Sequence, residues 1–79
     1  MQRIRSISGP YRFYFTSFDC NEPPHIHVER EDWTCKFWLQ PLGLARNVGF
    51  NARELLTIRR IIEAHLDSIM EAWHEHCGE

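Results

Sequence analysis

The segment Glu22-Pro23-Pro24-His25-Ile26-His27-Val28-Glu29 decides how this chain is expected to fold. Its two prolines lack backbone N–H donors and fix the backbone, so this part of the chain cannot lie inside a helix. The following residues alternate as in a strand, with Ile26 and Val28 on one face and His25 and His27 on the other. Residues two apart on a strand are about 6.5–7 Å apart. We therefore expect two solvent-accessible imidazoles side by side on one sheet face.

Similar patterns on both sides of this segment predict an antiparallel sheet. Residues 11–18 are rich in aromatic residues that favour strands, follow a Gly9-Pro10 turn and read as a strand. Residues 33–39 read as a third strand, on which Trp33 is the first of the inward-facing residues. Residues 42–48, behind Pro41, are too short to classify from pattern and could form a fourth, edge strand. The expected sheet covers about residues 4–48.

The rest of the chain is predicted to form one long helix over residues 52–76. Asn51 followed by Glu54 is typical of a helix N-terminus, and Gly78 is typical of a C-terminal stop. An apolar stripe at helical spacing indicates the face that packs on the sheet: Leu55, Ile58, Ile62, Leu66, Ile69 and Trp73. The helix would be about 37 Å long and the strands about 20–27 Å. We therefore expect its last turns to overhang the sheet.

The expected fold class is α+β, an antiparallel meander of three to four strands packed on one long C-terminal helix, in a single domain over residues 1–79. The charge and apolar pattern exclude some classes of protein. Net charge is −2 with neutral histidines, a poor electrostatic basis for general nucleic-acid binding. No apolar run approaches membrane length and the N-terminus lacks a signal-peptide apolar region, so a soluble cytoplasmic protein is expected.

Three cysteines without a C-x-x-C motif support neither a disulfide framework nor a cysteine zinc knuckle. Cys35 is expected to be a small core residue, and Cys20 and Cys77 are interpreted as incidental. The predicted helix also carries four carboxylates at four-residue spacing, which we call the acidic ridge: Glu63, Asp67, Glu71 and Glu75. This ridge is either a solvated face or a surface that meets a basic partner or imitates nucleic-acid phosphates.

Three interpretations of the histidine segment stay open. A metal such as zinc, nickel or iron could bind His25 and His27, with Glu22, or else His74 or His76 from the end of the helix, as the third ligand. Metal-free acid/base chemistry could use one histidine as base and the other, or Glu22, as the orienting group. In the third interpretation the histidines only hydrogen-bond to neighbouring backbone. Beyond a divalent metal such as zinc, no cofactor is expected.

The chain resembles the small bacterial family named domain of unknown function 4160 over nearly its whole length. The resemblance is carried by residues 9–15, 22–28 and 36–39, and by Leu44-Ala45-Arg46-Asn47, Gly49-Phe50, Glu54-Leu55 and Glu71-Ala72-Trp73-His74-Glu75. Cys20, Cys35 and Cys77 depart from the family pattern. The family has no settled activity, but its members often lie beside a gene for another short protein. The resemblance thus implies a toxin–antitoxin-like arrangement.

The leading hypothesis is a component of a small two-gene toxin–antitoxin-like module that acts by protein–protein contact, with an RNA-directed acid/base site at the histidine segment. His25, His27 and Glu22 would be the catalytic set, and Arg12 or Lys36 would contact phosphate. The rival hypothesis is a non-enzymatic binding or inhibitor protein that uses the acidic ridge and exposed aromatic rings. A metal-binding protein is the third. The sequence leaves open whether the protein is an enzyme.

Aromatic residues on the sheet face away from the helix predict association. One helix covers one face of a sheet, and large rings left on the other face would form an apolar patch of the kind that marks an interface. We expect a homodimer or a complex with a small partner protein. The expected interface residues are Tyr14, Phe18, Trp38, Met70 and Trp73.

Overall fold

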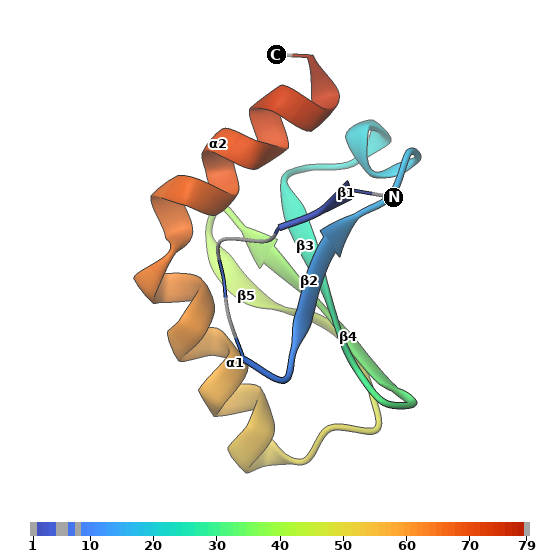
Figure 1. The fold of residues 1–79 in the computed structure, drawn as a ribbon, viewed down its shortest axis with the longest axis vertical. Coiled ribbons are helices and arrows are strands. Elements are labelled where there is room, and N and C mark those ends of the chain that lie inside the picture. Colours follow the sequence, from blue (N-terminus) through green and yellow to red (C-terminus); the bar gives the residue numbers. More distant parts are fainter. Residues whose placement is uncertain (1, 5–6, 8, 79) are drawn as a thin grey trace.

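The computed structural model describes residues 2–4, 7 and 9–78, and shows a twisted sheet with two helices on one face (Figure 1). The predicted ranges 1–79 and 4–48 include residues 1, 5, 6, 8 and 79, which lie outside this description. The strands are β1 (Gln2–Arg3), β2 (Arg12–Phe15), β3 (His25–Arg30), β4 (Trp33–Leu39) and β5 (Leu42–Val48). A 3₁₀ turn, η1 (Asp19–Asn21), joins β2 to β3, and the helices are α1 (Ala52–Ala64) and α2 (Leu66–Cys77).

The sheet is an antiparallel meander in the order β1-β2-β3-β4-β5. The predicted α+β class and the strands around the diproline segment are confirmed, and residues 42–48 do form a strand. The two residues of β1 add a short strand that lies before the predicted start of the sheet. Among the described helices, none is long and apolar enough to cross a membrane.

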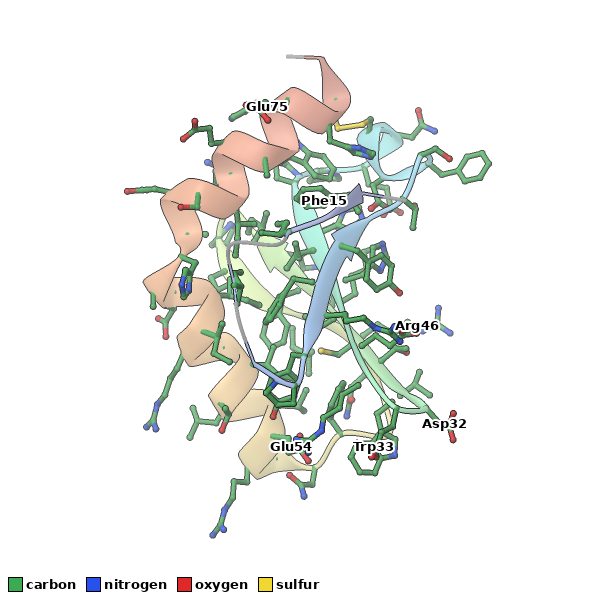
Figure 2. All side chains as sticks on the ribbon, in the orientation of Figure 1. Phe15, Asp32, Trp33, Arg46, Glu54 and Glu75 are labelled. Atoms are coloured by element: carbon green, nitrogen blue, oxygen red, sulfur yellow. A yellow bond between two sulfur atoms is a disulfide. The ribbon has the colours of Figure 1, made fainter. Side chains whose placement is uncertain are left out.

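The core lies between the sheet and the helices and follows the predicted alternation. Ile26 and Val28 are fully buried and pair in register with Phe37 and Cys35 of β4. The other core residues from the strands and helices include Phe13, Phe15, Leu39, Ile58, Ile62, Ile69 and Trp73. Figure 2 shows Phe15 between the sheet and the helices, and Arg46 on the opposite side. We call that opposite side, turned away from α1 and α2, the open face.

The prediction of one long helix is wrong, because the helical region divides at His65. This residue has φ −118° and ψ 19°, outside the helical range. Its ring Nδ1 lies 2.9 Å from the carbonyl oxygen of Ile61, and its backbone N–H donates to both Ile61 and Ile62. A side chain that competes for a backbone carbonyl in this way disturbs the helical hydrogen-bond ladder. The apolar spacing runs through the break without a gap, so the sequence pattern does not reveal it.

The break lets α2 change direction and stay against the molecule (Figure 1). The predicted overhang of the helix end is therefore also wrong. Trp73 is buried, with its ring 5.5 Å from that of Phe15 and 5.3 Å from that of His25. The end of α2 thus closes the core beside η1 instead of extending past the sheet.

Both predicted helix ends are confirmed. The Asn51 side chain accepts a hydrogen bond from the backbone N–H of Glu54 at 2.8 Å, and Gly78 ends α2 in the left-handed conformation. Trp33 differs from its prediction, because it is exposed at the end of the sheet, where its ring packs on Phe50 at 5.9 Å. Gly49 permits this packing, since it has φ 104° and a Cβ there would lie 2.3 Å from the Trp33 ring.

Ile62 should be a main support of the packing between helices and sheet. Its side chain is 0% exposed, and Ile62→Ala should cost about 2–4 kcal/mol of unfolding free energy, measured by urea denaturation. Leu56→Ala is the matched control on the same helix, because Leu56 is 48% exposed and should lose under about 1 kcal/mol. Equal losses in the two variants would contradict the observed helix orientation.

Candidate functional site

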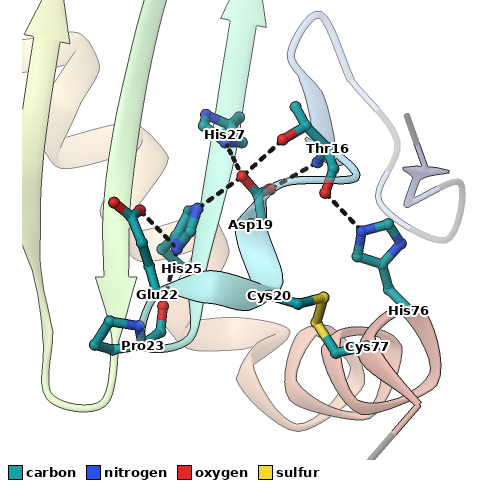
Figure 3. Close-up of a disulfide and its surroundings, with 9 residues drawn as sticks. All are labelled: Thr16, Asp19, Cys20, Glu22, Pro23, His25, His27, His76 and Cys77. Atoms are coloured by element: carbon teal, nitrogen blue, oxygen red, sulfur yellow. Dashed lines mark hydrogen bonds and ion pairs between the residues drawn. A yellow bond between two sulfur atoms is a disulfide. The ribbon is translucent and has the colours of Figure 1, made fainter.

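His25 and His27 lie against the carboxylate of Asp19, and we call these three residues the polar cluster (Figure 3). His27 Nε2 lies 3.0 Å from Asp19 Oδ1, and His25 Nε2 lies 3.0 Å from the same oxygen. The two imidazole rings are 5.2 Å apart in an edge-to-face arrangement. The sequence predicts the histidine pair but misses Asp19, which reads as part of an ordinary turn. Its one signal is a carboxylate in the loop that leads back to a strand with two histidines.

Asp19 reaches the cluster because the loop after β2 folds back on itself. Its carboxylate accepts from the backbone N–H of Thr16 at 2.6 Å and from the Thr16 hydroxyl at 2.8 Å, as aspartates at turns commonly do. Asp19 is buried, and burial alone would raise the pKa of its carboxyl. Hydrogen bonds from His27 and Thr16 outweigh burial and hold the pKa of Asp19 well below its ordinary value. Asp19 is therefore a fixed negative charge at neutral pH.

The prediction that both imidazoles are solvent-accessible is wrong for His25. Its side chain is 0% exposed, whereas that of His27 is 24% exposed. The strand register is as predicted, but η1 and the end of α2 cover the first residue of β3. The His25 ring lies 5.6 Å from the Trp38 ring and 5.3 Å from the Trp73 ring. His27 is the member of the cluster that reaches the open face, where it stacks on Tyr14 at 5.2 Å.

The hydrogen bonding of His25 fixes which of its nitrogens carries the proton. Nδ1 lies 2.9 Å from the carbonyl oxygen of Pro23, and because a carbonyl only accepts, Nδ1 is the donor. The Pro23-Pro24 turn is itself held by a hydrogen bond from the Leu39 N–H to the Pro24 carbonyl at 3.0 Å. The diproline therefore orients His25 so that Nε2 points at Asp19.

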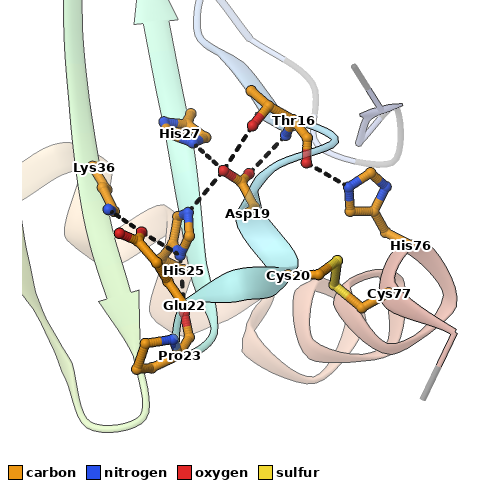
Figure 4. A network of polar contacts seen from close by, with 10 residues as sticks. All are labelled: Thr16, Asp19, Cys20, Glu22, Pro23, His25, His27, Lys36, His76 and Cys77. Atoms are coloured by element: carbon orange, nitrogen blue, oxygen red, sulfur yellow. Dashed lines mark hydrogen bonds and ion pairs between the residues drawn. A yellow bond between two sulfur atoms is a disulfide. The ribbon is translucent and has the colours of Figure 1, made fainter.

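Glu22, predicted as a catalytic residue, lies at the edge of the cluster (Figure 4). It is exposed, and its carboxylate accepts a hydrogen bond from Lys36 Nζ at 2.6 Å, which lowers the pKa of Glu22. Its Oε1 is 3.8 Å from His25 Nδ1, the nitrogen already bonded to Pro23. Glu22 thus neutralises Lys36, and Asp19 is the carboxylate that contacts both rings.

The other predicted site residues divide between the open face and the helices. Arg12, predicted to contact phosphate, forms an ion pair with Glu29 on the open face. His74, the alternative metal ligand, is exposed on α2. Among the described residues, the ligand atoms that gather within 4.8 Å of one another belong to Asp19, His25 and His27, so neither Glu22 nor His74 completes this group.

The predicted interface residues also divide. Tyr14 and Trp38 are half-buried on the open face, and Phe18 is 79% exposed in the loop before η1. Met70 packs against the core, and Trp73 lies inside it. Trp73 is therefore corrected from an interface residue to a core residue, because the bend at His65 brings it onto Phe15. The expected association itself stays a prediction.

The interpretation of Cys20 and Cys77 as incidental is wrong, because they form a disulfide with a Cα–Cα distance of 5.5 Å (Figure 3). The pair is separated by 57 residues and meets only because α2 returns to η1. Beside it, His76 Nε2 donates to the Thr16 carbonyl oxygen at 2.7 Å. The loop that carries Asp19 is therefore tied to the end of α2. Cys35 is the buried core thiol that the sequence predicts.

A row of four polar and aromatic side chains crosses the open face next to the cluster. Strand register pairs Tyr14 with His27, His27 with Lys36, and Lys36 with Arg46. We call these four residues the cross-strand row. A shift in register after Lys36 places Ala45 as an extra residue on β5. A groove of about 400 Å³ lies over the row. Its lining is Tyr14, His27, Thr34, Cys35, Lys36, Trp38, Ala45 and Arg46.

The groove holds two cations on directly paired residues, Lys36 and Arg46. Like charges opposite each other on neighbouring strands are unfavourable unless an anion lies near them. Glu22 neutralises Lys36, whose Nζ also lies 4.6 Å from the centre of the Trp38 ring. In the part of the chain that the structure describes, no carboxylate forms an ion pair with Arg46. The groove therefore combines aromatic surface with uncompensated positive charge.

The fold and the site define a class of protein: a small α+β domain with one open sheet face and a buried carboxylate between two imidazoles. Residues 11–74 match the model of the family described as Domain of unknown function (DUF4160). The chain belongs to this family, as its sequence motifs indicate. No curated protein and no solved structure matches the chain.

Removing the disulfide should destabilise the protein. Linking residues 57 apart restricts the unfolded chain, so the Cys20→Ser/Cys77→Ser double variant should lose about 2–4 kcal/mol of unfolding free energy. Urea denaturation with and without a reductant provides the control, because reductant should lower the stability of the wild type and leave the double variant unchanged. A wild type whose unfolding free energy is unchanged by complete reduction would contradict the predicted stabilisation by the disulfide.

Proposed function

We propose that the open face binds single-stranded RNA and presents its phosphodiester backbone to the polar cluster. The cross-strand row is the observation that carries this proposal. It places a tyrosine, an imidazole and two cations in line across four strands, with Trp38 beside them in the same groove. Aromatic rings next to Lys and Arg on an exposed sheet are how small proteins hold unpaired bases and their phosphates.

The acidic net charge is compatible with this proposal because the charges lie on different faces. The acidic ridge runs along α1 and α2, and its members are exposed there (Figure 2 shows Glu75). Lys36 and Arg46 lie across the sheet from these helices. Glu22 and Glu29 do lie on the open side, but they pair with Lys36 and Arg12. Salt screens exposed charges beyond about 8–10 Å, so an anion in the groove responds mainly to the local cations.

In this proposal the acid/base pair is His27 with Asp19, which replaces the predicted set of His25, His27 and Glu22. His27 is the imidazole that both contacts Asp19 and lines the groove, whereas His25 is enclosed by protein. Asp19 orients the His27 ring, as carboxylates do for catalytic histidines. RNA carries its own 2′-hydroxyl nucleophile, so an imidazole near the backbone is enough to assist proton transfer. Lys36 and Arg46, in place of Arg12, are the phosphate contacts in this proposal.

The proposed module is of the two-gene, toxin–antitoxin type, and protein–protein contact is part of it. The family resemblance supports the gene arrangement. The contact is supported by β5, whose side chains Leu44 and Val48 are exposed and which pairs with β4 along one edge. An exposed strand edge with apolar side chains favours the addition of a partner strand. In this proposal the partner occupies β5 and restricts the neighbouring groove, through Arg46 on the same strand.

Arg46→Gln should weaken RNA binding without unfolding the domain, since Arg46 is exposed. Loss of one phosphate contact should raise the Kd about fivefold near 0.15 M salt. The measurement is fluorescence anisotropy with a labelled single-stranded RNA, in the presence of EDTA. Arg60→Gln is the matched control, because Arg60 is exposed on α1, away from the groove, and should change the Kd less than about twofold.

If RNA binds in the groove, it should quench the tryptophan fluorescence of the wild type, and this quenching should be lost in Trp38→Phe. Equal effects of the two arginine variants, or no binding by the wild type, would overturn the proposal. A single-stranded DNA of the same sequence that binds as tightly would overturn the assignment to RNA.

A further inference from the structure

We propose that the polar cluster binds one divalent transition-metal ion through Asp19 Oδ1, His25 Nε2 and His27 Nε2. The two contacts from Asp19 Oδ1 to the imidazole nitrogens are both 3.0 Å, and the three ligand atoms all lie within 4.8 Å of one another. The proposal concerns the cluster alone and does not depend on RNA binding in the groove.

The buried nitrogen of His25 is the observation that points to a cation. Nδ1 donates to Pro23, so in the neutral ring Nε2 carries a lone pair. Nε2 is fully buried and has no hydrogen-bond partner among the described residues, although it lies 3.0 Å from Asp19 Oδ1. A lone pair that faces a carboxylate oxygen inside protein is costly unless a positive charge lies between them. A metal ion at this point would bind both atoms.

The surroundings of the three ligands are those of a metal site. Histidines that bind metals usually donate their other ring N–H to a backbone carbonyl or carboxylate, as His25 does to Pro23. The Asp19 carboxylate is itself oriented by the N–H and hydroxyl of Thr16. The Cys20–Cys77 disulfide ties the loop that carries Thr16 and Asp19 to the end of α2. The ligands are thus held in place before any ion arrives, which lowers the cost of binding.

The distances and the ligand types narrow the class of ion. With metal–ligand bonds of about 2.1 Å, ligands at right angles are about 3.0 Å apart and tetrahedral ligands about 3.4 Å apart. The observed 3.0 Å fits two ligands at right angles to Asp19 Oδ1. Two imidazoles with one carboxylate favour zinc, iron, cobalt or nickel over magnesium and calcium, which prefer oxygen ligands. Three protein ligands would leave further coordination positions of such an ion open.

An ion in the cluster would change the role of His27 in the proposed function. His27 Nε2 would give its lone pair to the ion and could not accept a proton, so a metal with open positions would polarise the phosphodiester in its place. The two proposals are tested separately. RNA binding is measured in EDTA, and metal binding is measured without RNA, so either can fail while the other stands.

Titration of chelator-stripped, disulfide-intact protein with Co²⁺, followed by visible absorption, tests the site. The expected result is one ion per chain, displaced by Zn²⁺, with a Kd raised at least about 100-fold in His27→Gln. His74→Gln is the matched control, because His74 is exposed on α2 outside the cluster, and should leave the Kd unchanged. Cys35 should not contribute a thiolate band, since burial raises the pKa of its thiol to about 12.

A second measurement guards against a variant that fails to fold. Zn²⁺ should raise the melting temperature of the wild type and of His74→Gln, because an ion that binds only the folded state stabilises it. The same Zn²⁺ should not raise the melting temperature of Asp19→Asn or His27→Gln. Absence of Co²⁺ binding by the wild type, binding unaffected by His27→Gln, or a thiolate absorption band would each overturn the proposal.

Discussion

A buried negative charge, that of Asp19, must be compensated by its neighbours, and the arrangement of one whole end of the molecule follows from this need. A carboxylate inside protein is tolerated only when it is paired and hydrogen-bonded. Thr16 provides two donors from the chain before η1, and His27 provides one from β3. The loop between β2 and β3 is therefore folded inward onto the sheet, and its polar interior faces the two imidazoles.

Two further connections hold this loop in place from outside. The disulfide and the hydrogen bond from His76 to Thr16 join it to α2, and α2 reaches it only because the helical region bends at His65. Trp73 then closes over His25 from the core side. The fold thus buries one imidazole and leaves the other at the wall of a groove, which gives two identical side chains different chemical environments.

Strand register connects this cluster to the open face. A slip of one residue in β3 would turn His27 into the core and Ile26 outward, so burial of Ile26 and Val28 also fixes the groove. The same register lines up His27 with Lys36 and Arg46 on the next two strands. Packing on one face of the sheet therefore decides which charges meet on the other.

The sheet, its inward-facing residues and the ends of the helical region could be predicted from the sequence, because they depend on local pattern. Alternation around the diproline predicts β3 and its inward residues, and Asn51 and Gly78 mark both ends of the helical region. The features that the sequence misses depend on contacts between distant residues. Asp19 joins the histidines only after its loop folds back, and Cys20 finds Cys77 only when α2 returns.

The bend at His65 shows a different limit. An apolar stripe that continues through a break has the spacing of an unbroken helix. His65 hydrogen-bonds to the Ile61 carbonyl oxygen through its side chain, but a histidine also occurs inside unbroken helices and so does not by itself predict a break. The prediction that His25 is exposed is wrong for a related reason, since alternation predicts which face a side chain takes but not what covers that face.

The protonation of His25 in the metal-free protein is the most direct test of the central claim, that the diproline carbonyl and Asp19 hold this ring with a bare Nε2. Long-range ¹H–¹⁵N correlation NMR at pH 8 reports which nitrogen of each ring carries the proton. The structure predicts that His25 carries a proton on Nδ1 and none on Nε2. A His25 ring protonated on Nε2, either alone or together with Nδ1, would contradict the bare Nε2 and, with it, the proposed arrangement of the cluster.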